Sequence, residues 1–232
     1  MEVVYEDNHI IIVNKRSGEI VQGDKTGDRP LSDFVKDYIK AKYQKPGNVF
    51  LGVVHRLDRP VWGLVVFART SKALTRLNKM FAEGKVHKTY WAIVEKRQQQ
   101  GAVGEWQMLE NWLVRNEKQN KSYAYDHEVP NSKLARLRYR CLAEGEKFDL
   151  VEVELMTGRH HQIRCQLANC GMPIRGDLKY GARRSNPDGS ISLLARKVEL
   201  EHPVTKELKR QEAPVPDELF TKLAALQPRR RY

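Results

Sequence analysis

The sequence predicts a globular α+β protein, and three observations lead to this prediction. The chain has 232 residues, of which 41% are hydrophobic, so it can bury a substantial core. Strand-like and helix-like segments are mixed without the regular alternation of a parallel βαβ fold. No internal repeat and no interior linker divides the chain, so we expect one domain over residues 1–227 and a basic tail at 228–232.

The N-terminal region predicts a hairpin followed by a helix. Residues 3–5 and 10–13 are short apolar runs joined by a polar turn, which is typical of a β-hairpin. The glycine-containing stretch 18–30 is expected to be a loop. Apolar spacing predicts a helix over 31–43, with Ser32 as its N-cap. The expected apolar stripe of this helix consists of Phe34, Val35, Tyr38 and Ile39.

Two strands and a second helix follow. Residues 49–54 predict a strand, and the run GLVVFA at 63–68 predicts a strand buried on both faces. Residues 70–83 predict a helix that is capped by Thr70 or Ser71.

The second half of the chain is richer in strand-like segments. The aromatic and β-branched run 88–94 predicts a strand, and several more are expected between 105 and 155. A short helix is predicted at 160–170 and a late strand at 191–200. The most polar loops are expected at 98–104 and 116–122.

The charge of the chain indicates a polyanionic partner. Lys and Arg number 41 against 29 Asp and Glu, which gives a net charge of +12 and a pI near 9.6. Such an excess favours contacts to nucleic-acid phosphates. A basic protein without such a partner is the alternative on charge alone.

Cysteine usage and hydropathy favour a cytoplasmic protein without a metal centre. Cys141, Cys165 and Cys170 are odd in number and scattered, which argues against a disulfide framework. The absence of a CxxC pair argues against structural zinc. We see no cleavable signal pattern, and no apolar stretch reaches the ~20 residues that a membrane helix needs.

One carboxylate lies among several bases in the segment HRLDRPVW. Asp58 lies between Arg56 and Arg59. Nearby positive charge keeps such a carboxylate ionised, and an ionised carboxylate can serve as nucleophile or base. A structural salt bridge is the alternative for an isolated motif of this kind.

A second cluster, TGRHHQIR, lies at a predicted strand-to-helix junction. His161 and Arg164 are three residues apart and are expected to share a helix face. The adjacent His160 and His161 should point different ways on a helix, which argues against a metal site. Arg164 can instead hold a phosphate or carboxylate in a fork. Tyr90, in the basic segment HKTYW, is either a core residue or a ring that stacks on a base.

Taken together, these segments resemble the RluA family of pseudouridine synthases. HRLD, Gly63 and the following apolar strand resemble the family motif HRLD-x-x-TSG, and TGRHHQIR resembles TGR-x-HQIR. LANCGMPIRGDLKYG, the early NKRSG and the late HPVT turn also resemble family elements. Several separated motifs in the same order are far more specific than any one of them. The resemblance extends from about Glu2 to about Pro216.

The resemblance implies a fold and an activity. The expected fold is the α+β pseudouridine synthase catalytic fold, with a bent, mostly antiparallel mixed sheet flanked by helices and a central basic cleft. The expected activity is isomerisation of specific uridines to pseudouridine in ribosomal or transfer RNA, after the base has flipped out of its stack. No cofactor is expected, and neither is a membrane or an obligate protein partner. The protein resembles the minimal monomeric type that lacks an N-terminal ribosomal-protein-like RNA-binding domain.

The resemblance also implies roles for individual residues. Asp58 corresponds to the catalytic nucleophile, Arg164 to the arginine that keeps it ionised, and Tyr90 to the tyrosine that stacks on the flipped base and moves a proton. Arg56 corresponds to the arginine that enters the RNA stack. The remaining residues expected to contact the substrate are His55, Leu64, Arg159, His161, Gln162 and Ile163.

Three residues depart from the family pattern, and two other functions are considered. Val61 and Trp62 stand where the family has Thr and Ser, and Arg16 replaces a proline. Trp62 motivates the alternative of an RNA-binding protein that has lost catalysis. A glycoside hydrolase would need a second acid beside HRLD, for which Asp177 is the nearest candidate.

Overall fold

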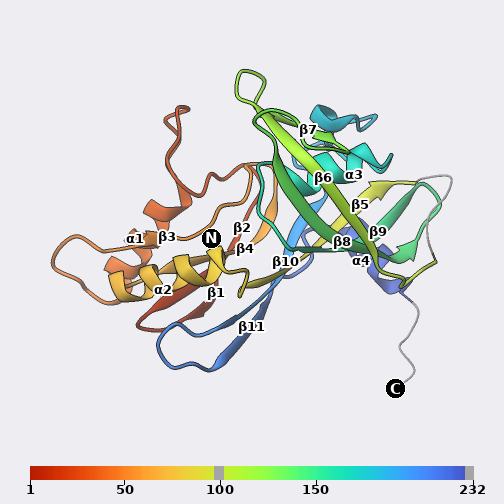
Figure 1. Ribbon diagram of the computed structural model, residues 1–232. Helices are drawn as coiled ribbons and strands as arrows, with labels where there is room; N and C mark the ends of the chain where they lie inside the picture. Colours follow the sequence, from red (N-terminus) through yellow and green to blue (C-terminus); the bar gives the residue numbers. More distant parts are fainter. Residues whose placement is uncertain (97–101, 228–232) are drawn as a thin grey trace. The chain divides into compact units, whose positions relative to one another are not determined.

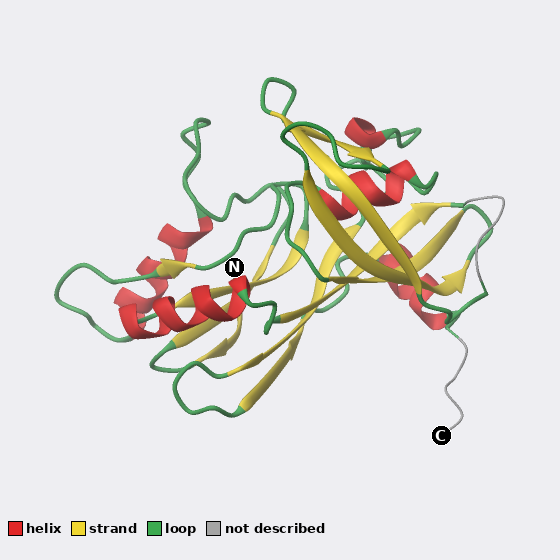
Figure 2. Cartoon of the chain, viewed as in Figure 1, coloured by secondary structure: helices red, strands yellow, loops and turns green. Residues whose placement is uncertain are grey.

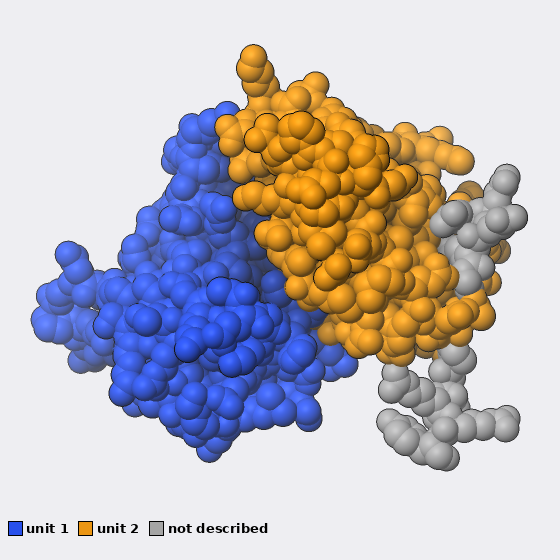
Figure 3. Space-filling view, viewed as in Figure 1, with its two compact units in different colours: residues 1–88, 195–214 blue, residues 89–194, 215–232 orange. Residues whose placement is uncertain are grey.

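The computed structural model describes residues 1–96 and 102–227. The expected basic tail and the first part of the polar loop 98–104 therefore lie outside the described residues. The chain forms two compact units (Figure 3). Unit 1 comprises Met1–Lys88 and Ala195–Pro214, and unit 2 comprises Thr89–Leu194 and the chain from Val215 onward. Figures 1 and 2 show their helices and strands, and each unit is described by itself.

Unit 1 is an antiparallel sheet with two helices. Its strand order is β1–β2–β4–β10, with β11 paired to β10 and β3 paired to β4. The strands are β1 (Glu2–Glu6), β2 (Ile10–Lys15), β3 (Gly52–Val53), β4 (Trp62–Ala68), β10 (Leu193–Glu201) and β11 (Leu208–Glu212), and the helices are α1 (Leu31–Lys42) and α2 (Ser71–Ala82). The predicted hairpin, the buried strand at 63–68 and the helix at 70–83 are thus confirmed. Continuous apolar runs bury most of β2 and β4, as Ile10, Ile11, Val65 and Val66 show.

The N-terminus of α1 is stabilised differently from our prediction. Ser32 does not cap the helix, because it lies inside α1 and is buried. The preceding loop supplies the acceptors instead: the backbone N–H groups of Leu31 and Ser32 donate to the carbonyls of Ile20 and Val21, at 2.7 and 3.2 Å. Phe34, expected in the apolar stripe, is 43% exposed, and its ring lies under the Arg29 guanidinium.

The other elements of unit 1 differ less from expectation. Of the strand predicted at 49–54, only Gly52–Val53 pairs with a neighbour. The cap of α2 is confirmed, since the Thr70 hydroxyl accepts a hydrogen bond from the Ala73 N–H at 3.2 Å. β11 was not predicted, because its sequence LKRQE has no apolar alternation.

Unit 2 is an antiparallel sheet in the order β5–β9–β8–β6–β7. Its elements are β5 (His87–Glu95), β6 (Gln107–Asn116), β7 (Lys121–Tyr125), β8 (Lys133–Glu144), β9 (Phe148–Leu155), α3 (Gln162–Asn169), the 3₁₀ turn η1 (Leu178–Tyr180) and α4 (Glu218–Ala225). α3 packs on β6 and β7, and α4 packs on β8 and β9. The antiparallel pairing within each unit agrees with the predicted sheet.

Two predicted boundaries in unit 2 shift for local reasons. The helix predicted at 160–170 begins only at Gln162, because His161 has a left-handed backbone with φ of 52°. The strand predicted at 191–200 begins at Leu193. α4 was not predicted, although Asp217 caps it by accepting from the Phe220 N–H at 2.9 Å. No helix in the described part of the chain is long and apolar enough to cross a bilayer.

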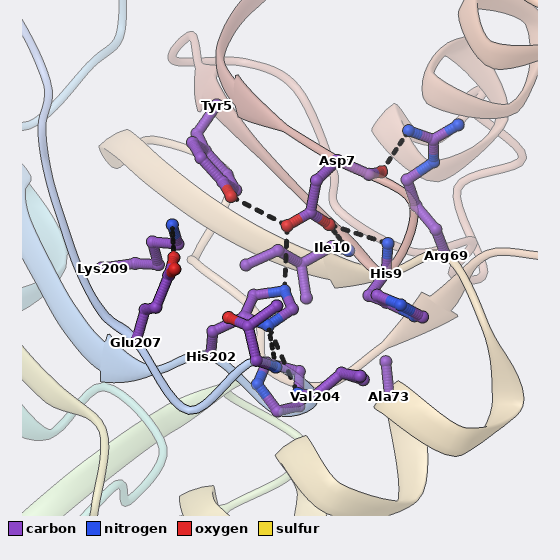
Figure 4. A network of polar contacts seen from close by, with 12 residues as sticks. Tyr5, Asp7, His9, Ile10, Arg69, Ala73, His202, Val204, Glu207 and Lys209 are labelled. Carbon is purple, nitrogen blue, oxygen red and sulfur yellow. Dashed lines mark hydrogen bonds and ion pairs between the residues drawn. The ribbon is translucent and has the colours of Figure 1, made fainter.

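A buried polar network joins two turns of unit 1 (Figure 4). The Asp7 carboxylate accepts hydrogen bonds from the N–H groups of His9 and Ile10 at 2.7 and 2.9 Å, and from the Tyr5 hydroxyl at 2.8 Å. Burial alone would raise the pKa of Asp7, but these hydrogen bonds outweigh it and the pKa is lowered.

His202 connects this carboxylate to the turn between β10 and β11. Its Nε2 lies 2.9 Å from Asp7 Oδ2, and its Nδ1 accepts from the N–H groups of Val204 and Thr205. Because Nδ1 is an acceptor, the proton of the neutral ring lies on Nε2, toward Asp7 (Figure 4). The HPVT segment, which resembles an element of the family, thus forms a turn that is stabilised by its own histidine.

We predict that Asp7→Ala lowers the free energy of unfolding by about 1–3 kcal/mol, because several partly buried donors lose their common acceptor. Urea denaturation measures this change. The neighbouring Asn8 is exposed, so Asn8→Ala is the matched control and should change stability by less than about 0.5 kcal/mol. Equal effects of the two substitutions would contradict a structural role of the Asp7 network.

Candidate active site

Asp58 lies in a tight turn of unit 1. Its carbonyl oxygen accepts the Val61 N–H at 3.0 Å, which closes a turn through Arg59 and Pro60. A second loop holds this turn, since the Gly18 N–H donates to the Arg59 carbonyl at 2.9 Å. The Asp58 side chain is partly exposed. The backbone around the candidate nucleophile is therefore fixed from both sides.

A buried lysine also holds this turn in place. Lys15 is 0% exposed, and its ammonium donates to the carbonyls of Arg16, Arg59 and Val61 at 2.9, 3.0 and 2.7 Å. Three acceptors satisfy all three N–H groups of a lysine. The C-terminal end of β2 is thereby tied to residues on both sides of Pro60.

Electrostatics couples this lysine to Asp58. Burial lowers the pKa of Lys15 from 10.5 to about 8, while the carboxylates of Glu19 and Asp58 oppose that change. Sequence reasoning missed this residue, because a lysine at the end of a strand is ordinarily exposed. The signal was present in the NKRSG element, whose second residue is Lys15.

The residues that depart from the family pattern are accommodated at the start of β4. Val61 is 2% exposed, so an apolar side chain suits its position. Trp62 is partly exposed and begins the strand. Gly63 has φ of +113°, and a Cβ at this position would lie 2.4 Å from the carbonyl oxygen of Ala195, so only glycine fits. Leu64, the expected apolar wall, is buried at 2% exposure.

His55 lies against the core of unit 1. Its Nε2 accepts the Val66 N–H at 3.0 Å, and its ring stacks on Phe81 with centroids 4.9 Å apart. Burial, and then the nearby Lys88 ammonium, lower the pKa of His55 to about 3. His55 is therefore neutral and helps to position the HRLD segment. The neighbouring Arg56 is exposed.

Unit 2 carries the other two candidate catalytic residues. Tyr90 lies on β5 opposite Val153 of β9 and is 6% exposed. Arg164 lies in the first turn of α3, and its Nε and Nη2 donate to the two oxygens of Asp177 at 2.7 and 2.9 Å. Both side chains are nearly inaccessible, at 6% and 1% exposure. The arginine fork expected from the sequence thus binds a carboxylate of its own unit.

Asp177 and its neighbours orient this arginine. The Asp177 carbonyl accepts the N–H groups of Tyr180 and Ala182, which fixes the turn that carries the carboxylate. The Tyr180 ring lies 5.1 Å from the Arg164 guanidinium. Asp177, the nearest candidate for a second acid, is thus engaged in holding Arg164.

Gln162 organises the TGR segment. Its side-chain oxygen accepts from the Thr157 hydroxyl and the Arg159 N–H at 2.8 and 2.9 Å, and its Nε2 donates to the Arg136 carbonyl at 3.0 Å. Arg159 is exposed, although its Nε donates to the Leu134 carbonyl. Gln162 thus holds the loop that precedes α3.

The two adjacent histidines lie together, contrary to our expectation. Their rings stack with centroids 3.8 Å apart, because His161 has a left-handed rather than a helical backbone. His161 Nδ1 lies 3.0 Å from the Tyr180 hydroxyl. Burial, followed by nearby positive groups that include Arg164 and Lys179, lowers the pKa of His161 to about 2. Ile163, the other expected apolar wall, is 5% exposed.

Among residues 1–96 and 102–227, no group of three or more His, Cys, Asp or Glu side chains is placed to hold a metal ion. The polar contacts around the candidate residues are made by backbone carbonyls, amides and neighbouring side chains.

We predict that Lys15→Met lowers the free energy of unfolding by about 2–4 kcal/mol, because three carbonyls lose a charged donor. Chemical denaturation with urea gives the value. Arg16→Met is the matched control, since Arg16 is adjacent and exposed, and it should be nearly neutral. A Lys15→Met protein as stable as Arg16→Met would show that the buried ammonium does not support the turn.

We predict an acid-sensitive stability that depends on His55. With a folded pKa of about 3 and an ordinary value of 6.5, His55 binds a proton in the unfolded chain that it does not bind when folded. The free energy of unfolding should therefore fall as pH drops from about 6.5 toward 3, by up to about 1.4 kcal/mol per pH unit for this group.

His55→Gln retains an acceptor for the Val66 N–H but does not titrate, so it should reduce the slope by the share of one proton. The share of His161, whose pKa is also lowered, remains. Urea denaturation at several pH values between about 4 and 7 measures the slope. His127→Gln, at an exposed histidine, is the control and should keep the wild-type slope. The same slope in wild type and His55→Gln would refute the assignment.

Known proteins are similar to this chain over most of its length. A family model described as RNA pseudouridylate synthase matches residues 9–169. The uncharacterized RNA pseudouridine synthase YhcT of Bacillus subtilis is 31% identical over 94% of this chain and 70% of its own length. Ribosomal large subunit pseudouridine synthase D of Nitrosomonas europaea is 30% identical over 97% of this chain and 65% of its own length. The chain thus spans about two thirds of these relatives.

A solved structure shows the same fold. Human RNA pseudouridylate synthase domain containing 4 superposes with a TM-score of 0.78 at 22% identity, over 98% of this chain and 94% of that one. The fold expected from the sequence is therefore confirmed, while the basic cleft remains a prediction. The matched segment includes both the HRLD turn and the TGRHHQIR junction. This chain belongs to the RNA pseudouridylate synthase family.

Proposed function

We propose that this protein isomerises specific uridines of ribosomal RNA to pseudouridine, with Asp58 as the nucleophile. The observation that carries the proposal is the family match over residues 9–169, which contains Asp58, Tyr90 and Arg164. The named function of relatives such as ribosomal large subunit pseudouridine synthase D favours ribosomal RNA as the substrate. The net charge of +12 suits a phosphate-bearing partner.

In the proposed reaction, uridine is rearranged without a redox change. The bond between N1 of uracil and C1′ of ribose breaks, the base turns, and a bond forms between carbon-5 and C1′. Carbon-5 loses its hydrogen to solvent, and N1 gains a proton. The target base must first leave its stack, because the reacting atoms are otherwise shielded. The reaction needs no cofactor.

The proposed roles follow the family resemblance. Asp58 attacks, Arg164 favours its ionised form, Tyr90 stacks on the base and moves a proton, and Arg56 enters the RNA stack. The other proposed substrate contacts are His55, Leu64, Arg159, His161, Gln162 and Ile163. The packing within each unit is compatible with these roles, because Lys15 fixes the Asp58 turn and Asp177 orients Arg164. We further propose that the protein acts as a cytoplasmic monomer.

Two other functions have less support. An RNA-binding protein without catalysis is motivated by Trp62, but a whole set of candidate catalytic groups would rarely persist without use. A glycoside hydrolase would need a second acid, and Asp177, the nearest candidate, is committed to a buried fork with Arg164.

We predict that the wild-type protein releases tritium from RNA labelled at carbon-5 of uridine, and that Asp58→Asn abolishes this release. The amide cannot serve as the nucleophile, but it is similar in size, so RNA affinity should change little. The RNA would come from cells that lack this protein, and binding would be measured in parallel.

Asp33→Asn is the matched control, because it removes a carboxylate from the surface of α1 in the same unit. It should release tritium at the wild-type rate. RNA binding by the wild type without any tritium release would instead favour the binding-protein alternative. Release of free uracil would favour a hydrolase.

A further inference from the structure

The β6–β7 hairpin presents an exposed aromatic face. β7 pairs with β6 and is the last strand in the order of unit 2 (Figure 1). On the inner face, Leu113 and Ser122 are buried beside α3. On the outer face, Tyr123 and Tyr125 are 38% and 40% exposed. Aromatic rings of this size are ordinarily buried when no partner requires them at the surface.

The spacing of the two tyrosines suits nucleic-acid bases. Residues two apart on a strand point to the same face and are separated by about 7 Å. This distance is about twice the stacking repeat of bases, so alternate unpaired bases of a strand can each meet a ring. Trp112, opposite Tyr125 in the pairing register, extends the same face across β6.

Two lysines adjoin this face, and neither pairs with an acidic side chain of the described residues. Lys118 is exposed in the hairpin turn, and Lys121, two residues before Tyr123, has its ammonium 5.4 Å from the centre of the Tyr123 ring. Arg115 is also exposed, but it lies opposite Ser122 in the register and therefore on the inner face. Within the described residues, no acidic side chain forms an ion pair with any of these three. Lys179 donates to the carbonyls of Gln119 and Asn120, so its charge is added to the tip of the hairpin.

The adjoining strand β8 differs from the hairpin, because its positive charges are paired with acidic side chains. On β8, Arg136, Arg138 and Arg140 are all paired with glutamates of neighbouring strands. Their charge is neutralised within the sheet, whereas that of the hairpin tip is not. The low pKa of His161 has the same origin in part, since Arg115 and Lys179 are among the positive groups that lower it.

We propose that the β6–β7 hairpin is an RNA-binding edge that holds a single-stranded segment of the substrate other than the reacting uridine. Unpaired bases stack on Tyr123 and Tyr125, and phosphates contact Lys118 and Lys121. The partner is a nucleic acid because the face combines aromatic rings with uncompensated positive charge. This inference rests on the proposed function and assigns to the hairpin a part of substrate recognition that no catalytic residue supplies.

The charge of the hairpin is tested with the double variant Lys118→Ala/Lys121→Ala. The probe is a fluorescein-labelled single-stranded oligouridine of about 20 nucleotides, and fluorescence anisotropy gives Kd across about 50–200 mM salt. We expect Kd to rise about tenfold at the lower salt, and the slope of log K against log salt to fall by about 1.4, since each single-strand phosphate contact contributes about 0.7.

The control is Lys40→Ala/Lys72→Ala, which removes two exposed lysines from the helices of unit 1. It should leave the salt slope near that of the wild type. If the hairpin variant binds with wild-type affinity and slope, or changes no more than this control, the proposal is overturned.

The aromatic contact is tested at Tyr123. Tyr123→Ala should raise Kd about tenfold, whereas Tyr123→Phe, which keeps the ring, should bind like the wild type. In tritium-release assays the loss for Tyr123→Ala should appear in KM. Equal affinities for Tyr123→Ala and Tyr123→Phe would overturn base stacking. Unchanged RNA affinity, with loss of self-association measured by sedimentation, would assign the face to a second copy of this chain.

Failure of this inference differs from failure of the proposed function. Wild-type tritium release with unaltered binding by the hairpin variants would overturn only the hairpin proposal. A wild-type protein that releases no tritium would overturn the proposed function, and with it the inference that rests on it.

Discussion

The ammonium of Lys15 is the interaction on which the candidate catalytic turn depends. A buried cation is costly unless its donors are satisfied, and here three backbone carbonyls satisfy them. Two of these carbonyls belong to Arg59, which directly follows Asp58, and to Val61, on the other side of Pro60. The contacts that offset the cost of burying the Lys15 ammonium therefore also restrict the backbone that carries the Asp58 carboxylate. Displacing either partner would leave the other unsatisfied, so the end of β2 and the turn hold one another in place.

Unit 2 also buries a cation, and there a carboxylate satisfies it. Arg164 is buried like Lys15, but it is held by a bidentate fork to Asp177. Gln162 fixes the loop before the helix, and Tyr180 lies beside the guanidinium. Each unit thus positions a candidate catalytic group through a buried polar contact rather than through apolar packing. Such contacts are directional, and they define an orientation that apolar packing alone would not.

The distribution of charge explains how an RNA substrate can be recognised by a chain with many salt bridges. The arginines of β8 are paired with glutamates of neighbouring strands, so their charges compensate one another. They therefore contribute little to the electrostatic potential that attracts phosphates. The excess of positive charge must therefore lie elsewhere. The tip of the β6–β7 hairpin is one such place, because no acidic side chain in the described part of the chain pairs with Lys118 or Lys121.

The sequence by itself determined the elements whose apolar pattern is local, and it determined the family. The N-terminal hairpin, the buried strand GLVVFA and the Thr70 cap follow from neighbouring residues, so they could be predicted. Only the tertiary structure decided contacts that join distant residues. The carbonyls of Arg59 and Val61 lie 44 and 46 positions after Lys15, and nothing in a local pattern reveals them.

The same reason accounts for the predictions that were wrong. Carbonyls of the preceding loop, rather than the Ser32 side chain, satisfy the start of α1, and a left-handed backbone at His161 stacks two histidines that a helix would separate. The residue types of the candidate site could thus be read from the sequence. Their burial, protonation and orientation were decided by the fold, because these properties depend on which distant groups replace water around each side chain.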